Sequence, residues 1–278
     1  MIFIKKKTCR PFFSLCILFS AALQNFSIYA QALPDGNTSD LNAYMSTVNP
    51  FDRKKPLYTE VDVVTTAQNG SEKRMAYKMY TVRKNATVSI MIEFSQPAGY
   101  KDTRLLIDVP ETGGAPNVAV MMNFFLTPFR IKQMQRSMPF FETDINSEDM
   151  NPRDTSCDEY CIISGGDSAH TQDADMVTVR GIPLTHSSYS EMIYYIDTKK
   201  HMSLKTEFYR ADGSLAKVLT VQKTAVINGI QTATKIKITD MKKKSYTVLT
   251  YKNTRYGEDH SAIVNEAYLK AGKPQVHK

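Results

Sequence analysis

The sequence predicts a mainly β protein in which an antiparallel sheet is accompanied by a few helices. Short alternating or apolar segments recur along most of the chain, and turns rich in Gly and Asn separate them. Asn69-Gly70, Asp212-Gly213 and Asn228-Gly229 each lie between two such segments, which is typical of tight β-hairpins. These features predict an antiparallel meander of short strands.

The first expected element is a helix over residues 40–48, where apolar residues recur at helical spacing. Ser39 can cap this helix, and Pro50 would end it. Strands are expected next, over residues 57–66, 73–82, 86–95, 103–109 and 117–125.

The strand expected over residues 86–95 alternates most clearly. Val88, Ile90, Ile92 and Phe94 share one face, and the opposite face is polar except for Met91. The pattern leaves open whether the apolar face lines a cavity or packs at the back of the sheet.

The middle of the chain, residues 129–175, has a different character. Met and Phe residues are scattered there among polar residues, and two cysteines and a loop rich in Gly, Asp and Ser follow. We expect a mobile cover with short helices rather than a second domain. Its apolar residues are Met134, Met138, Phe140, Phe141, Ile145 and Met150.

Strands are expected to resume over residues 161–164, 176–183, 189–197, 204–209, 215–226, 230–240 and 246–255. A final helix over residues 263–269 is expected to be capped by Ser261. Because no linker rich in Gly, Ser or Pro divides residues 33–278, we expect them to form a single domain.

The first 32 residues have the features of a secretory signal peptide. Cationic residues at positions 5–7 and 10 precede an apolar run over residues 12–23, shorter than the roughly 18 residues that span a bilayer. The small-residue site Ala30-Gln31-Ala32 follows. We expect cleavage after Ala30 or Ala32 and a mature bacterial protein in the periplasm, with an uncleaved anchor as the alternative.

The charge of the chain argues against a nucleic-acid partner. Residues 1–32 contain four cations and no acids, so their removal lowers the net charge from +7 to +3. No dense basic stripe is interleaved with aromatic residues. The run Lys242-Lys243-Lys244 is interpreted as a solvated turn, with contact to an anionic membrane surface as the alternative.

Cys157 and Cys161 are the two cysteines left after residues 1–32 are removed. In an oxidising compartment, such a close pair predicts a local disulfide that staples a loop. A redox-active pair would normally have the shorter Cys-x-x-Cys spacing, and a zinc site would need more ligands. His170, Asp173 and Asp175 resemble a chance cluster in a polar loop, so no metal is expected.

The sequence lacks the usual catalytic signatures. Gly-x-Ser-x-Gly, His-Glu-x-x-His, a Walker loop and Gly-x-Gly-x-x-Gly are all absent. The acidic pairs Glu148-Asp149 and Asp158-Glu159 are interpreted as surface residues, because sequence neighbours point in different directions. We therefore expect no enzymatic activity and no cofactor. A hydrolase whose triad forms only in space remains an alternative.

Methionine and aromatic residues are abundant, with 14 Met, 13 Phe and 15 Tyr. Because Met is flexible and polarizable, surfaces rich in it adapt to variable apolar ligands. The densest stretch is 118–129, which contains Val120, Met122 and Phe124. This stretch is either an ordinary strand buried on both faces or a strand with one face on an apolar cavity.

Several segments together resemble a known family. These are residues 204–219 (LKTEFYRADGSLAKVL), 227–230 (INGI), 246–249 (YTVL) and 265–269 (NEAYL), with 140–150 (FFETDINSEDM) further upstream. In this order they are similar to the bacterial outer-membrane lipoprotein-sorting proteins of the LolA/LolB-like group of periplasmic carriers. The chain departs from the family pattern at Thr143, where the family has glycine.

The resemblance implies an incomplete, strongly curved antiparallel β-barrel with helices that plug its concave face. Acyl chains of a lipoprotein or another lipid would lie between sheet and helices, and the segment 129–175 would be the lid that moves to load and release them. The implied partners of this monomeric carrier are an inner-membrane transporter and an outer-membrane acceptor. The lipid-binding candidates are Val88, Ile90, Ile92, Phe94, Val120, Met122, Phe124, Met134, Met138, Phe140, Phe141, Ile145 and Met150.

The alternative function is a non-enzymatic periplasmic module on the same scaffold. In that case the apolar interior is only a core, and the outer surface binds a protein. Bound lipid in the purified protein would favour the carrier.

Overall fold

The structure is a computed structural model that describes residues 38–48, 55–110, 117–122, 127–131, 137–150, 158–163, 175–184 and 187–271. Contacts divide the chain into two units, Met1–Gln31 and Ala32–Lys278. The predicted signal peptide lies outside the described residues, all of which belong to the second unit.

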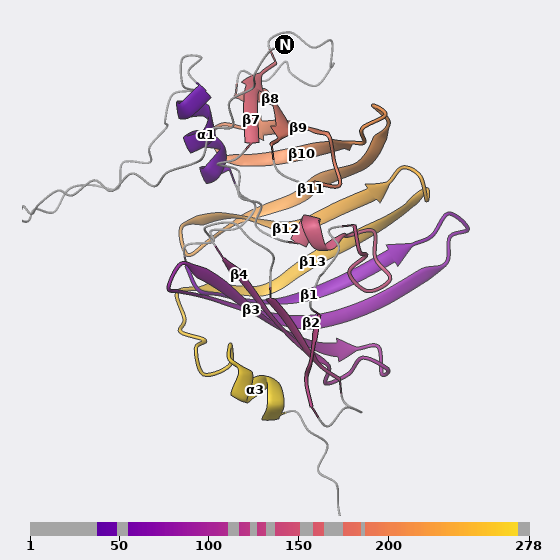
Figure 1. Cartoon of the computed structure of the whole chain (residues 1–278), viewed down its shortest axis with the longest axis vertical. Helices are drawn as coiled ribbons and strands as arrows, with labels where there is room; N and C mark the ends of the chain where they lie inside the picture. Colours follow the sequence, from indigo (N-terminus) through magenta and orange to yellow (C-terminus); the bar gives the residue numbers. More distant parts are fainter. Residues whose placement is uncertain are drawn as a thin grey trace, which may run out of the picture. The chain divides into compact units, whose positions relative to one another are not determined.

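One antiparallel sheet dominates the described part of this unit (Figure 1). Its thirteen strands lie in the order β6-β5-β4-β3-β2-β1-β13-β12-β11-β10-β9-β8-β7. The strands are β1 (Leu57–Thr66), β2 (Glu72–Lys84), β3 (Thr87–Gln96), β4 (Arg104–Pro110), β5 (Asn117–Met121), β6 (Phe129–Ile131), β7 (Asp158–Ile162), β8 (Met176–Pro183), β9 (Glu191–Asp197), β10 (Met202–Tyr209), β11 (Leu215–Ile227), β12 (Ile230–Asp240) and β13 (Ser245–Tyr256).

Two meanders make up this sheet, and they meet where the first and last strands pair. β1 to β6 lie on one side, β7 to β13 on the other, and Val63 of β1 lies opposite Leu249 of β13. β6 and β7 are therefore the two edges of a curled sheet that does not close (Figure 1). The predicted incomplete antiparallel barrel is confirmed, although β6 and β7 both fall in the segment expected to be a mobile cover.

The two faces of the sheet have separate apolar cores. Val61, Ile92 and Phe94 belong to the larger cluster, on what we call the inner face. Tyr80, Met91, Leu106 and Leu269 belong to a cluster on the opposite, outer face. Met91, the exception in the alternating pattern of its strand, is thus fully buried on the outer face. A strand of a sheet covered on both faces carries apolar residues in both directions.

Helices cover less of the inner face than expected. The described helices are α1 (Thr38–Thr47), α2 (Ser147–Met150) and α3 (Glu266–Ala271). α1 packs near β7, and four-residue α2 lies over the inner face, whereas α3 packs with the outer-face cluster (Figure 1).

The cap of α3 also differs from the prediction. The backbone N–H of Tyr268 donates to Oδ1 of Asn265 (2.8 Å), so Asn265 is the N-cap rather than Ser261. Ser261 instead donates from its own N–H to Asp259 in the turn before the helix (2.9 Å).

Arg104 of β4 attaches α3 to the outer face. Its guanidinium donates to the carboxylate of Glu93 (3.0 Å) and to the backbone carbonyl of Tyr268 (2.8 Å). The same group lies 4.2 Å from the centre of the Tyr268 ring. One cation therefore satisfies a strand carboxylate and a helix carbonyl, while Leu269 fills the apolar contact beside them.

Gly181 of β8 lies under two tyrosine rings near α1. A Cβ at this position would come within 2.8 Å of the Tyr160 ring and 3.1 Å of the Tyr194 ring. We predict that Gly181→Ala lowers the free energy of unfolding by about 1–3 kcal/mol, because the added methyl overpacks this contact. Gly99→Ala is the matched control, since no atom lies within 4 Å of its Cβ position. Equal urea midpoints for the two variants would contradict the prediction.

His260 makes the outer-face core sensitive to pH. Its ring is buried 5.4 Å from that of Tyr80. Burial, with a smaller contribution from Arg255, lowers the pKa of His260 below its usual 6.5. The unfolded chain then binds the proton first as pH falls below about 6.5, and stability decreases by at most about 1.4 kcal/mol per pH unit. Between pH 7.5 and pH 5.5, the free energy of unfolding in urea should fall less for His260→Gln than for the wild type. Equal decreases in the two proteins would contradict this.

Candidate functional site

The inner face brings together most of the residues predicted to bind lipid. Ile92, Phe94, Val120, Phe140 and Ile145 belong to its buried cluster, and Ile90, Met122 and Phe141 pack against it while partly exposed. The side chain of Val88 is also buried. Met138 is exposed. Phe124, Met134 and the side chain of Met150 lie outside the described residues.

The cover over this face is a segment we call the strap, residues 137–150. A bridge between Pro139 and Asn146 folds it back on itself. Phe140 and Ile145 are then buried in the inner-face cluster, and the N–H of Phe140 donates to the carbonyl of Ile145 (2.7 Å). The backbone hydrogen bond thus holds two apolar anchors side by side against the sheet.

Aromatic rings fasten the strap to β2 and β3. The ring of Phe141 lies 4.6 Å from that of Phe94 and 5.1 Å from that of Tyr100. The ring of Phe140 contacts those of Tyr77 and Phe94, each at 6.3 Å. Burial raises the pKa of Tyr77 well above its usual value, so this phenol stays neutral within the cluster.

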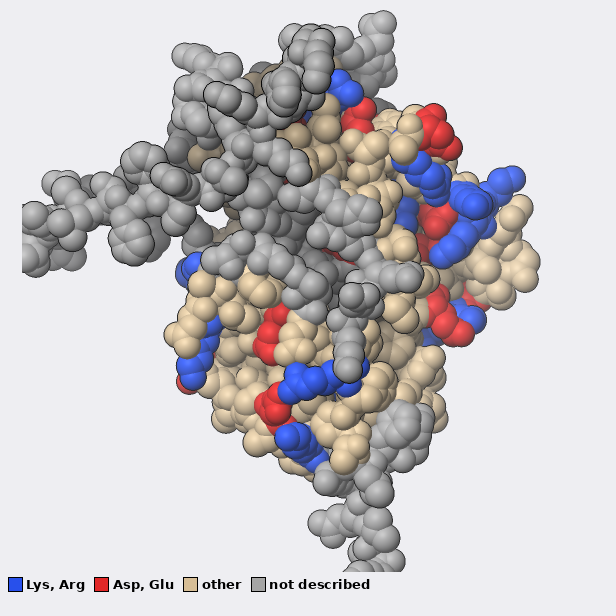
Figure 2. Space-filling view, viewed as in Figure 1, with Lys and Arg blue, Asp and Glu red and all other residues tan. Residues whose placement is uncertain are grey.

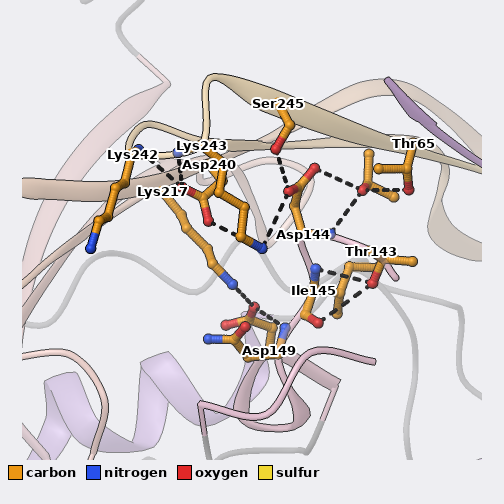
Figure 3. A network of polar contacts seen from close by, with 12 residues as sticks. Thr65, Thr143, Asp144, Ile145, Asp149, Lys217, Asp240, Lys242, Lys243 and Ser245 are labelled. Carbon is orange, nitrogen blue, oxygen red and sulfur yellow. Dashed lines mark hydrogen bonds and ion pairs between the residues drawn. The ribbon is translucent and has the colours of Figure 1, made fainter. Parts of the chain in front are cut away.

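Asp144 fastens the strap to β13 (Figure 3). Its carboxylate accepts from the hydroxyls of Ser245 (2.6 Å) and Thr247 (3.0 Å), and its own N–H donates to the Thr247 hydroxyl (3.0 Å). Thr65 of β1 lies 3.0 Å from the same hydroxyl. Because Thr247 gives its only proton to Asp144, Thr65 must donate to Thr247. The carboxylate therefore joins the strap to two neighbouring strands.

Asp149 forms a buried ion pair with Lys217 of β11 (Figure 3). Nζ of Lys217 lies 2.7 Å from Oδ2 of Asp149, and the two side chains are 6% and 5% exposed. The hydroxyl of Tyr189 donates to the other carboxylate oxygen (2.7 Å), and the N–H of Asn146 donates to Oδ2 (2.7 Å). Burial and the nearby Asp149 raise the pKa of Tyr189, so its proton stays in this hydrogen bond.

Glu148 extends the attachment to the loop before β9. It accepts from the hydroxyl of Ser187 (2.5 Å) and from the N–H of Ser188 (2.8 Å). The strap, which is part of the predicted lid, is thus attached along its length to β1, β2, β3, β11, β13 and this loop.

The sequence interpretation of the acidic pairs is wrong for three of four residues. Glu148, Asp149 and Asp158 are buried, and only Glu159 is exposed. The sequence did contain a signal for buried acids. Lys217 occupies an inner-facing position among the apolar residues of β11, and a buried cation requires a buried anion.

The structure does not show the predicted disulfide. Cys161 lies on β7 as an exposed free thiol, and Cys157 lies outside the described residues. In the turn before β13, the backbone N–H groups of Lys242 and Lys243 donate to Oδ1 of Asp240. Within the described ranges, no group of three His, Cys, Asp or Glu side chains is placed to hold a metal ion.

A comparison of the sequence with models of protein families gives a match. A family model described as "Uncharacterized protein" matches residues 86–271, more than half of the chain. The chain belongs to this family. No curated protein sequence gives a significant match.

Solved structures share its fold. A DUF1329 family protein from Desulfovibrio piger has a TM-score of 0.73 at 20% identity, covering 83% of this chain and 96% of its own. A domain from Vibrio parahaemolyticus described as an outer membrane lipoprotein-sorting protein has a TM-score of 0.71 at 17% identity, covering 83% of this chain and 96% of its own. A LolA superfamily protein from Nitrosomonas europaea has a TM-score of 0.64 at 17% identity, covering 83% of this chain and 98% of its own.

These comparisons confirm the resemblance to lipoprotein-sorting proteins of the LolA group. At such low identity they establish the fold, a curled and unclosed antiparallel sheet. The helices in the described part of the chain are all too short or too polar to cross a membrane.

We predict that the buried ion pair controls the stability of the strap. Lys217→Met leaves Asp149 buried without its cation, and the free energy of unfolding should fall by about 3–5 kcal/mol in urea titrations. Lys252→Met is the matched control, because Lys252 pairs with Asp62 at the surface and should change stability by less than about 1 kcal/mol. Similar losses in the two variants would show that burial adds nothing to the Lys217 pair.

Proposed function

We propose that this protein is a non-enzymatic periplasmic carrier that holds the acyl chains of a lipid or lipoprotein on the inner face of its sheet. The observation that supports this most directly is the continuous apolar inner face, formed by Met, Ile, Val, Leu and Phe side chains from both meanders. An acyl chain gains roughly 0.8 kcal/mol for each buried CH₂, so such a face can hold lipid without a charged contact.

The partly exposed members of the cluster support a ligand rather than a sealed core. Met79, Ile90, Leu219 and Val221 pack against the buried cluster but keep part of their own surface open. These side chains leave apolar surface beside the buried cluster that an apolar ligand would cover.

Charge gives no support to a nucleic-acid partner. Figure 2 shows Lys and Arg next to Asp and Glu on the visible face, where the coloured residues form no broad field of one sign. The inner-face charges at the strap are paired, as in Lys217 with Asp149. An uncharged chain is the ligand that this surface accommodates at least cost.

The relatives supply the proposed pathway. Two of the similar structures are described as an outer membrane lipoprotein-sorting protein and a LolA superfamily protein. By analogy, we propose a periplasmic location after signal-peptide cleavage, an inner-membrane transporter as donor and an outer-membrane acceptor.

Native mass spectrometry with solvent extraction, on mature protein purified without detergent, tests the carrier proposal. Lipid or acylated peptide bound at near-stoichiometric amounts is the expected result, and extraction identifies its class. A clean apo mass that persists after incubation with membrane lipids would contradict the proposal and favour a protein-binding module.

A charged substitution should distinguish the two faces of one strand. Leu219 and Val218 are neighbours on β11, both partly exposed, and Val218 lies on the outer face beside Glu207. We predict that Leu219→Glu weakens the binding of a fluorescent fatty acid at least tenfold, because a carboxylate on the apolar face loses hydration. Val218→Glu, the matched control, should bind like the wild type. Equal affinities in both variants would place the ligand elsewhere.

A further inference from the structure

The turn between β12 and β13 presents three consecutive lysines at one end of the sheet. Lys242, Lys243 and Lys244 are all exposed. The buried carboxylate of Asp240 holds the turn, because its Oδ1 accepts from the backbone N–H groups of Lys242 (3.0 Å) and Lys243 (2.9 Å). The backbone of the turn is therefore fixed, and its three cationic side chains remain on the surface.

Two of these three charges have no acidic partner. Nζ of Lys243 lies 3.9 Å from Oδ1 of Asp144 and 3.8 Å from Oδ2 of Asp240, and both carboxylates are buried. Figure 3 shows the Lys242 ammonium pointing away from this network. In the part of the chain that the structure describes, no ion pair includes Lys242 or Lys244. Because the acids are buried and the lysines exposed, an approaching surface meets the positive charge first.

The charges of the adjacent β1–β2 turn cancel one another. Lys73 pairs with Glu142 (2.9 Å), and Arg74 pairs with Glu72 (2.6 Å). These ion pairs are exposed and leave little net charge beside β13. The lysine turn is therefore a local source of positive potential at this end of the sheet.

Exposed apolar side chains accompany the lysines. Met241, the first residue of the turn, is 44% exposed, although its N–H is held by the carbonyl of Ala216 (3.0 Å). Leu184, directly after β8, is 66% exposed. It lies at the same end of the sheet, because β8 and β12 run in the same direction and a row of paired residues joins their ends: Asp240, Lys217, Phe208, Met192 and Gly181.

Lys244 occupies a backbone position that suits another residue better. Its φ of 53° lies in the left-handed region, where a Cβ is unfavourable and Gly or Asn is the usual residue. A cation therefore stands where Gly would cost less. This position offers a substitution that removes the charge and relieves the backbone together.

The chemistry of the turn favours a bilayer over an acidic protein. Arg presents a rigid fork that matches single carboxylates, whereas the Lys ammonium is a point charge on a flexible stem. A bilayer with anionic headgroups offers diffuse negative charge with apolar chains directly beneath it, so it accepts Lys and an exposed Met together. An acidic peptide would satisfy the lysines and leave Met241 in water.

We propose that the β12–β13 turn docks this protein onto an anionic phospholipid surface, with Lys242 and Lys244 at the headgroups and Met241 between them. Each Lys near such a surface strengthens binding by roughly fivefold, so the contact is weak, reversible and sensitive to salt. This inference goes beyond the proposed carrier function and does not depend on cargo.

Co-sedimentation of the mature protein with vesicles tests the proposal. The wild type should bind vesicles of phosphatidylglycerol and phosphatidylethanolamine, should not bind vesicles of phosphatidylcholine alone, and should be released at high salt. Lys242→Gln with Lys244→Gly should bind the anionic vesicles about tenfold more weakly or less, because both unpaired charges are gone. Met241→Ser should weaken binding about threefold, because the apolar contact is lost.

The matched control removes the same net charge elsewhere. Lys84→Gln with Lys223→Gln replaces two exposed lysines of β2 and β11 and should bind within twofold of the wild type. Urea titration checks the fold, and Lys244→Gly alone should be at least as stable as the wild type.

Equal losses in the two double variants would overturn the proposal, because attraction would then follow net charge alone. Equal binding to neutral vesicles would also overturn it. If the wild type binds soluble polyglutamate but no vesicles, the turn recognises an acidic protein instead. The vesicle assay needs no cargo, so its failure would leave the carrier proposal standing.

Discussion

The buried ion pair between Lys217 and Asp149 is the interaction on which the inner face depends. It fixes one end of the strap to β11, while Asp144 and the Phe140 ring fix the middle and the other end to β13 and β2. Each buried charge in this network has its hydrogen-bond partners, so desolvation is offset at each one. The strap can therefore lie across an apolar sheet with no buried polar side-chain atom left unpaired among its described side chains.

This attachment separates two physical roles in the proposed carrier. The strap end is polar and paired, whereas the remaining inner face is apolar and mostly buried, with partly exposed residues such as Met79 and Leu219. Hydrophobic burial has little directional preference, so such a face would accept acyl chains of different lengths. The outer face has its own core under α3, fixed by Arg104 and separate from the inner-face cluster.

Strand positions and the apolar face of β3 could be predicted because alternation and hairpin turns are local signals. Met91 was visible as an exception, but its burial under α3 depends on a segment far away in the sequence. The buried carboxylates were misread because Glu148 and Asp149 gain their partners from β11 and from the loop before β9. Similarly, Asn265 rather than Ser261 caps α3. Several residues before this helix have side chains suited to an N-cap, so the sequence did not identify which of them does so.

The length of the strap has a geometric consequence. Contacts of Phe140 with Phe94 on β3 and of Asp149 with Lys217 on β11 lie five strand spacings apart, about 24 Å along a flat sheet. The ten residues from Phe140 to Asp149 include a turn and the helix α2, so they span considerably less than their extended length. The strap therefore lies across the curled sheet like the chord of an arc. A longer chord would fit a more open sheet, so we expect insertions in this segment to accompany wider interiors.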